Sequence, residues 1–136
     1  MQKLYIEPTK VTPEIHLSPD ENIFLIRGNS SPEDVRSLYY PVIEWIKLFI
    51  DEVIEGEYGS YTKENPLRFQ TDLSYFNSSS AKFFFDIFIE LKRLITADIP
   101  VVIEWLYDSE DTEQKQAGED FSNMAGMGFT FTPKNK

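Results

Sequence analysis

The sequence contains no cysteine and only one histidine, His16, among its 136 residues. Without cysteine the chain has neither disulfides nor thiolate chemistry, which fits a reducing compartment. Its apolar runs fall short of the ~20 residues that a membrane-spanning helix needs, and the N-terminal segment lacks the apolar stretch of a signal peptide. These absences predict a soluble, cytoplasmic protein that does not insert into a membrane.

Positive charge is scarce as well. The chain has 13 Lys and Arg residues against 23 Asp and Glu residues, for a net charge of −10. Because binding to nucleic acid needs clustered basic side chains, this balance argues against DNA or RNA as a partner. An acidic surface suits a basic protein partner, or simply keeps the chain soluble.

The patterns that carry catalysis or metal binding are missing. A serine nucleophile needs a nearby base and an oxyanion site, yet His16 lies in a predicted strand and no Gly-x-Ser-x-Gly elbow occurs. The acidic residues of segment 108–113 lack the spacing of a calcium loop and fit a solvated helix start. The sequence therefore predicts no catalytic residue, no metal site and no cofactor.

Apolar residues are plentiful enough for one core, at 41% of the chain, of which many are aromatic. Length and the absence of repeats or linkers predict a single domain over residues 1–136. Alternating or clustered apolar residues predict five strands, with residues 99–108 central and the last strand at an edge. These strands are expected at 12–18, 22–28, 67–73, 99–108 and 128–134.

Helical spacing predicts a first helix with an apolar face between Val42 and Val53. Ser31 is its expected N-cap and Pro32 its first residue. Pro41 lacks an N–H group, so the helix should kink or restart there, and Gly56 should end it.

A polar loop is expected at 58–66, a second helix at about 79–96 and a weaker, acidic helix at 109–126. The resulting order of elements, β-β-α-β-α-β-α-β, contains several strand–helix–strand units. It predicts an α/β fold in which helices pack on a mixed sheet of about five strands.

An asparagine and three serines, Asn77-Ser78-Ser79-Ser80, separate the third predicted strand from the second predicted helix. One interpretation is structural: Asn77 or Ser78 caps the helix. The other is functional, because the N-terminus of a helix favours an anion. A phosphate on a serine there would gain the helix dipole and free N–H groups without breaking the helix.

Projection of the second helix at 100° per residue gives three surfaces. The core arc should hold Phe83, Phe84, Ile87, Phe88, Leu91, Leu94 and Ile95. Asp86, Glu90 and Arg93 are expected opposite that arc. A third stripe holds Ser78, Lys82, Phe85, Ile89 and Lys92. Phe85 and Ile89 either form a docking surface for a partner or pack under the first helix or the C-terminal segment.

Several segments together resemble the SiaC family of bacterial regulatory phosphoproteins. The stretch DLSYFNSSSAKFFFDI resembles the phosphorylation segment of that family, and EPTKVTPEI, PVIEWI and PVVIEWLYD match its pattern elsewhere. The resemblance spans nearly the whole chain. It implies a fold similar to STAS domains, the anti-sigma-factor antagonists, in which a serine also follows a strand and opens a helix.

The resemblance implies a partner switch. A cognate kinase would phosphorylate the protein and a PP2C-type phosphatase would remove the phosphate. The unphosphorylated form would bind and activate a diguanylate cyclase, which raises cyclic di-GMP and promotes biofilm. The family's acceptor follows the asparagine of an Asn-Thr-Ser-Ser stretch, so here it is Ser78, with Ser79 as the fallback. Asn77, Ser80 and Lys82 surround it, and Lys82 could pair with the phosphate.

Two alternatives remain open from the residues. The first is a STAS-like anti-sigma-factor antagonist, whose partner would be an anti-sigma kinase. The second is a small acidic enzyme or ligand-binding domain that uses an aromatic surface formed by Tyr39, Tyr40, Tyr58 and Tyr61, and a deep pocket with convergent polar groups would favour it.

Overall fold

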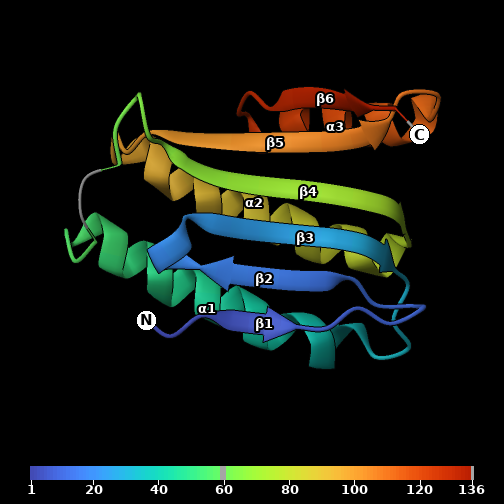
Figure 1. Cartoon of the computed structure of the whole chain (residues 1–136), viewed down its shortest axis with the longest axis horizontal. Helices are drawn as coiled ribbons and strands as arrows, with labels where there is room; N and C mark the ends of the chain where they lie inside the picture. The colour runs from blue at the N-terminus through green and yellow to red at the C-terminus, as the bar shows by residue number, and fades with distance from the viewer. Residues whose placement is uncertain (59–60, 136) are drawn as a thin grey trace.

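A mixed sheet of six strands in the order β1-β2-β3-β4-β5-β6 runs through the computed structural model (Figure 1), which describes residues 1–58 and 61–135. The strands are β1 (Leu4–Ile6), β2 (Glu14–Ser18), β3 (Ile23–Ser30), β4 (Leu67–Phe76), β5 (Val101–Asp108) and β6 (Thr130–Lys134). The helices are α1 (Val35–Ile54), α2 (Ser78–Thr96) and α3 (Thr112–Ala125), and a short 3₁₀ turn (Pro19–Glu21) joins β2 to β3. Residues 59 and 60, in the predicted loop 58–66, lie outside the described residues.

All three helices cover the same face of the sheet (Figure 1). β1, β2 and β3 pair antiparallel, whereas β3, β4, β5 and β6 pair parallel. Each parallel pair needs a crossover, and crossovers between parallel strands are right-handed. Because β3 to β6 follow one another in both sequence and space, the three crossovers all fall on one side.

The core lies between this helical layer and the sheet. Alternate residues of β4, from Leu67 to Leu73, are buried against the helices, as the sequence pattern predicts. The largest fully buried side chains include Trp105, Phe69, Phe84 and Phe88. On the opposite face, polar side chains pair across strands: Arg27 with Glu14, Lys134 with Asp72, and Gln70 with Glu104. The uncovered face is therefore largely polar and charged.

The α/β fold and the mixed sheet are confirmed, with one strand more than expected. The additional strand, β1, has only three residues and pairs with β2 at the edge of the sheet. A segment so short carries little periodic signal, so the sequence pattern does not predict it. In the part of the chain that the structure describes, no helix is both long enough and apolar enough to cross a bilayer.

The start of α1 differs from the prediction. Asp34, not Ser31, is the N-cap, and its carboxylate accepts a hydrogen bond from the Ser37 N–H at 3.2 Å. The Ser31 hydroxyl instead donates to Asn29 Oδ1 at 2.7 Å. Hydrogen bonding to Ser37 lowers the pKa of Asp34. The capping carboxylate is therefore favoured in its charged form.

The other helix boundaries follow local chemistry. Of the two outcomes predicted at Pro41, a restart is wrong, because the helix is continuous from Val35 to Ile54, and a kink stays a prediction. Only the bond to the Ser37 carbonyl is lost, and Ser37 is exposed, so water can satisfy that oxygen. Gly56 follows the end of α1 with a φ of +84°, as the sequence predicts.

Candidate functional site

The passage from β4 into α2 forms the candidate site. Asn77 is the N-cap of α2, and its side-chain oxygen accepts a hydrogen bond from the Ser80 N–H at 2.9 Å. Of the two caps that the sequence allowed, the structure has Asn77. The three serines therefore occupy the first three positions of the helix, where backbone N–H groups lack partners within the helix and carry partial positive charge.

The three serines differ in their surroundings. Ser78 and Ser79 are exposed, whereas Ser80 is fully buried. The Ser79 hydroxyl donates to Asn77 Oδ1 at 3.1 Å. Within the described part of the chain, no hydrogen bond holds the Ser78 hydroxyl. A modifying enzyme can thus reach two of the three hydroxyls, and it can reach the third only after the helix moves.

The buried Ser80 belongs to a hydroxyl cluster that joins three elements. Its side chain donates to the Ser30 carbonyl oxygen at 3.1 Å and lies 2.8 Å from Ser30 Oγ. Ser30 Oγ also lies 2.6 Å from the hydroxyl of Tyr39 on α1. Burial raises the pKa of the Tyr39 phenol, and the hydrogen bond with Ser30 only partly offsets this. The phenol therefore stays neutral at physiological pH.

Lys82 lies one turn beyond Ser78 on α2 and is exposed. Its ammonium group sits 5.8 Å from the centre of the Phe83 ring. Lys82, Phe83 and Asp86 line one side of a pocket of about 560 Å³ whose other side comes from Tyr40 and neighbouring residues of α1. Lys82 is near the serines along the helix, as expected, and a contact with a phosphate on Ser78 remains a prediction.

The two apolar residues of the outer stripe have different environments. Ile89 is 38% exposed, whereas Phe85 is partly buried and packs against the core. Ile89 also lines, with Ile54 of α1, a pocket of about 490 Å³ between the C-terminal halves of the two helices. An exposed apolar side chain therefore lies on the same stripe of α2 as Ser78. That Phe85 and Ile89 bind a partner stays a prediction.

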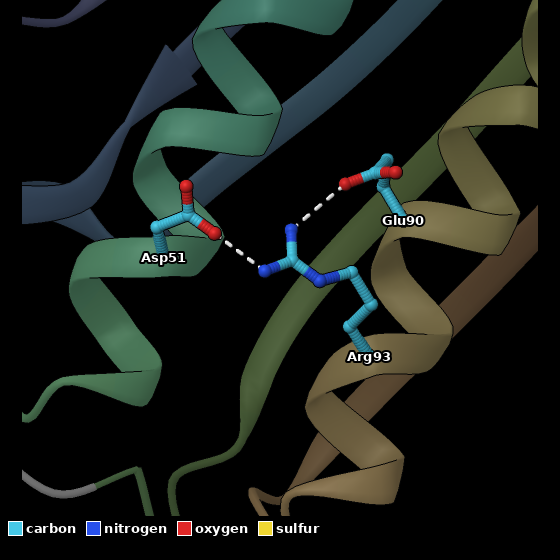
Figure 2. Close-up of polar contacts among 3 residues, drawn as sticks. All are labelled: Asp51, Glu90 and Arg93. Atoms are coloured by element: carbon cyan, nitrogen blue, oxygen red, sulfur yellow. Dashed lines mark hydrogen bonds and ion pairs between the residues drawn. The ribbon is translucent and has the colours of Figure 1, made fainter.

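The predicted outer face of α2 needs correction. Asp86, Glu90 and Arg93 are half-buried and do not point straight to solvent. Arg93 forms ion pairs with Glu90 and, across the helix–helix groove, with Asp51 of α1 (Figure 2). Ile95, expected in the core, is 43% exposed. Asp86, Glu90 and Arg93 are half-buried because α1 packs along that side of α2.

The residues of the alternative readings do not gather into one site. Tyr39 is buried inside the core, whereas Tyr40 is 57% exposed. Tyr58 and Tyr61 line a different pocket, next to the C-terminal end of α1. His16 pairs with Leu25 in the middle of β3, roughly 15 Å along the strand from Ser30. It therefore does not reach the serines of α2. Among the described residues, no group of acidic or histidine side chains could hold a metal ion.

Sequence reasoning missed Ser30 and Tyr39 as partners of the serine run. One signal was available. The carboxyl ends of adjacent parallel strands lie side by side, so hydroxyl residues at the end of β3 should lie near residues that follow β4. Ser30 pairs with Phe76, the last residue of β4. The helical spacing also puts Tyr39 in line with Val42 and Ile46 on the buried face of α1.

Comparison with known proteins decides the family. The model of the SiaC family regulatory phosphoproteins matches residues 6–134. This chain belongs to the SiaC family. An uncharacterized protein of Pseudomonas aeruginosa (strain UCBPP-PA14) is 28% identical over 129 residues, which cover 95% of this chain and 94% of that protein. The resemblance seen in the sequence is thereby confirmed.

Solved structures of SiaC share the fold. Apo-SiaC of Pseudomonas aeruginosa superposes with a TM-score of 0.79 at 27% identity, over 98% of this chain and 99% of that chain. SiaC in a crystal structure with the diguanylate cyclase SiaD, which it activates, gives a TM-score of 0.79 at 26% identity. That match also covers 98% of this chain and 99% of the SiaC chain. SiaC family proteins are thus regulatory, and one of them binds a diguanylate cyclase as its activator.

Proposed function

We propose that this chain is the switch protein of a partner-switching system and that phosphate on Ser78 turns it off. A cognate kinase adds the phosphate and a PP2C-type phosphatase removes it. The unphosphorylated chain binds and activates a diguanylate cyclase, and so raises cyclic di-GMP and promotes biofilm. The observation that carries the proposal is the difference within the serine run: Ser78 is exposed and its hydroxyl makes no hydrogen bond to residues 1–58 or 61–135, whereas Ser80 is buried.

The local electrostatics favour a phosphate at this position. The first turn of α2, which the structure describes in full, holds no acidic residue. A phosphate carries a charge of about −1.5 to −2 and is stabilised by the positive end of the helix dipole. Since Ser78 is exposed, the added group extends into solvent and the core is unchanged. The modification therefore alters the surface of the protein and leaves its fold intact.

A phosphate on Ser78 would disfavour docking on the outer stripe of α2. Ile89, about three turns along the helix from Ser78, offers an apolar contact, and Phe85, about two turns along, is partly buried beside it. A charged group next to such a surface must be desolvated when a partner binds, and it repels acidic partner groups. A loss of about 2.7 kcal/mol weakens binding ~100-fold. That change is large enough for a switch.

The test compares Ser78→Asp with Ser78→Ala and the unaltered protein. Each is mixed with diguanylate cyclases purified from the bacterium that encodes this chain, and binding and synthesis of cyclic di-GMP from GTP are measured. The Ser78→Asp protein should bind at least ~30-fold more weakly and fail to activate, because about 2 kcal/mol of interface energy is lost. Ser78→Ala should behave like the unaltered protein, and all three should have nearly the same melting temperature.

Two results would contradict the proposal. Full activation by the Ser78→Asp protein would show that charge at this position does not control binding. An unaltered protein that neither binds nor activates any of those cyclases would remove the proposed output. Ser79→Asp is the neighbouring control, and a larger effect there than at position 78 would move the acceptor to Ser79.

A further inference from the structure

Segment 77–80 is tied to the end of β3 at both of its ends. The Asn77 N–H donates to the Ser30 carbonyl oxygen at 3.0 Å, and the Ser80 hydroxyl donates to the same oxygen at 3.1 Å. The Ser80 N–H also bonds Asn77 Oδ1. Ser78 and Ser79, between these attachment points, are exposed. The turn is therefore held at its first and last residues and projects in the middle.

The hydroxyls beneath this turn form a chain with one direction. Ser80 donates to the Ser30 carbonyl, and Ser30 Oγ donates to Ser80 Oγ at 2.8 Å. Because the Ser30 proton is used in that bond, Tyr39 is the donor in its 2.6 Å contact with Ser30 Oγ. All three side chains have a relative exposure of 0%. The hydroxyl protons of Ser30, Tyr39 and Ser80 thus each have an acceptor.

Stability alone does not account for three buried hydroxyls. A buried hydrogen bond contributes modestly to net stability, and replacing a bonded pair with apolar groups of similar shape is often nearly neutral. A fully satisfied buried network, in contrast, rigidifies its surroundings and selects one arrangement. Here the network links β3, α1 and the first turn of α2. It therefore sets where the exposed serines lie relative to the α1–α2 surface.

We propose that Ser30, Tyr39 and Ser80 are positioning residues that present the Ser78 hydroxyl, and not that of Ser79, to the kinase. This inference rests on the proposed function. In the transfer, Ser78 Oγ forms a new P–O bond, the bond from the γ-phosphorus to ADP breaks, and the hydroxyl proton passes to a base of the kinase. The Ser79 proton is already donated to Asn77 Oδ1 at 3.1 Å, which makes Ser79 the poorer acceptor while the turn is held.

The test measures which serine is modified. The unaltered protein, Ser80→Ala and Tyr39→Phe are each incubated with Mg²⁺, ATPγS and a lysate of the bacterium that encodes the chain, and thiophosphorylated peptides are mapped by tandem mass spectrometry. In the unaltered protein, Ser78 should carry nearly all of the label. In Ser80→Ala the ratio of label on Ser78 to label on Ser79 should fall about tenfold. Tyr39→Phe, which keeps the Ser30–Ser80 bond, should lower it about threefold.

Thr71→Val is the matched control. Thr71 is also a buried hydroxyl, 1% exposed, and donates to the Glu104 carbonyl at 3.3 Å, away from the turn. Thr71→Val should leave the ratio of label on Ser78 to label on Ser79 unchanged. The ratio is internal to each sample, so a difference in the total amount of label does not alter it, and Thr71→Val shows the effect of lost stability alone. Melting temperatures of all variants are recorded beside it.

The outcomes separate the two proposals. The positioning role would be overturned if Ser80→Ala and Tyr39→Phe, both folded, kept the Ser78-to-Ser79 label ratio of the unaltered protein. It would also be overturned if Thr71→Val lowered that ratio equally. In either case the proposed switch would stand. No label on either serine of the unaltered protein would overturn the proposed function, and this inference with it. If Ser80→Ala does not fold, Tyr39→Phe decides alone.

Discussion

Gly118 of α3 lies directly against the indole of Trp105 on β5. A Cβ atom at position 118 would come within 2.6 Å of the ring atoms Cδ1 and Nε1. Trp105 is itself only 1% exposed, and its Nε1–H donates to the Gln114 carbonyl at 3.0 Å. The indole is thus hydrogen-bonded to α3 and in close contact with it one turn further along, so it cannot move away from a larger residue without straining that bond. This contact sets how closely α3 packs on the sheet.

Gly118→Ala should destabilise the protein by at least about 2 kcal/mol, because the added methyl group overlaps a ring that is fixed by a hydrogen bond. Gly128→Ala is the matched control, since no atom lies within 4 Å of a Cβ at that position. Urea unfolding of both variants measures the difference. Equal midpoints for the two would show that the indole and α3 can separate at little cost.

Asn77→Ala should destabilise the protein by about 1 kcal/mol, because the Ser80 N–H loses its capping acceptor. Ser79→Ala, which removes only an exposed hydroxyl, should change the free energy of unfolding by less than about 0.5 kcal/mol. Both are measured by denaturant unfolding. If Asn77→Ala lowers the free energy of unfolding no more than Ser79→Ala does, the hydrogen bond from the Asn77 N–H to the Ser30 carbonyl holds the turn by itself.

The ion pair of Arg93 with Asp51 joins α1 to α2 at partly exposed positions. A double-mutant cycle with Arg93→Ala and Asp51→Ala should give a coupling energy of about 0.5 to 1 kcal/mol, and salt should reduce it. The Lys115–Glu119 pair within α3, whose charged atoms lie 3.9 Å apart, is the comparison and should couple less because its contact is longer. A coupling that is independent of salt would contradict an electrostatic origin.

Acid should weaken the N-cap of α1. Hydrogen bonds from Ser37 lower the pKa of Asp34 in the folded state, so its charged form stabilises the fold above the pKa of an unfolded aspartate, about 3.9. The stabilisation is lost as pH falls through the lower, folded value. Asp34→Asn keeps an acceptor but does not titrate. The stability of the unaltered protein relative to Asp34→Asn should thus decline below about pH 4, as thermal unfolding across pH would measure. A difference between the two proteins that does not change with pH would contradict this role of Asp34.

Much of the architecture followed from local pattern. The alternation in segment 67–73 identified β4 and its buried face, and the spacing of apolar residues identified α1 and α2. α3 was predicted as a polar, acidic helix with weak periodicity, and it is present. Gly56 marked the end of α1 correctly, because a positive φ is a property of one residue and its neighbours. Segment β1 was missed because three residues are too few for a periodic pattern, and its place in the sheet depends on pairing with β2.

The α1 N-cap shows the limit of local reasoning. Ser31 and Asp34 are both good capping residues, and the sequence alone favoured the first. In the structure the Ser31 N–H bonds the Val11 carbonyl at 2.8 Å, which keeps residue 31 in the loop from β3 and leaves the cap to Asp34. The partner comes from a distant part of the chain, so no local pattern reveals it.

In the candidate site, too, some features follow from the local sequence and others only from tertiary packing. The sequence by itself determined that a hydroxyl run opens α2, that Asn77 could cap it, and that Ile89 lies on the same stripe as Ser78, because these depend on chain order and helical period. Only the tertiary structure distinguished three chemically identical serines. Ser80 is buried and Ser78 exposed because the parallel pairing of β3 with β4 brings Ser30 beneath the turn and α1 brings Tyr39 against it. Burial depends on which residues from distant parts of the chain pack against a side chain, and the local sequence of three adjacent serines does not indicate this.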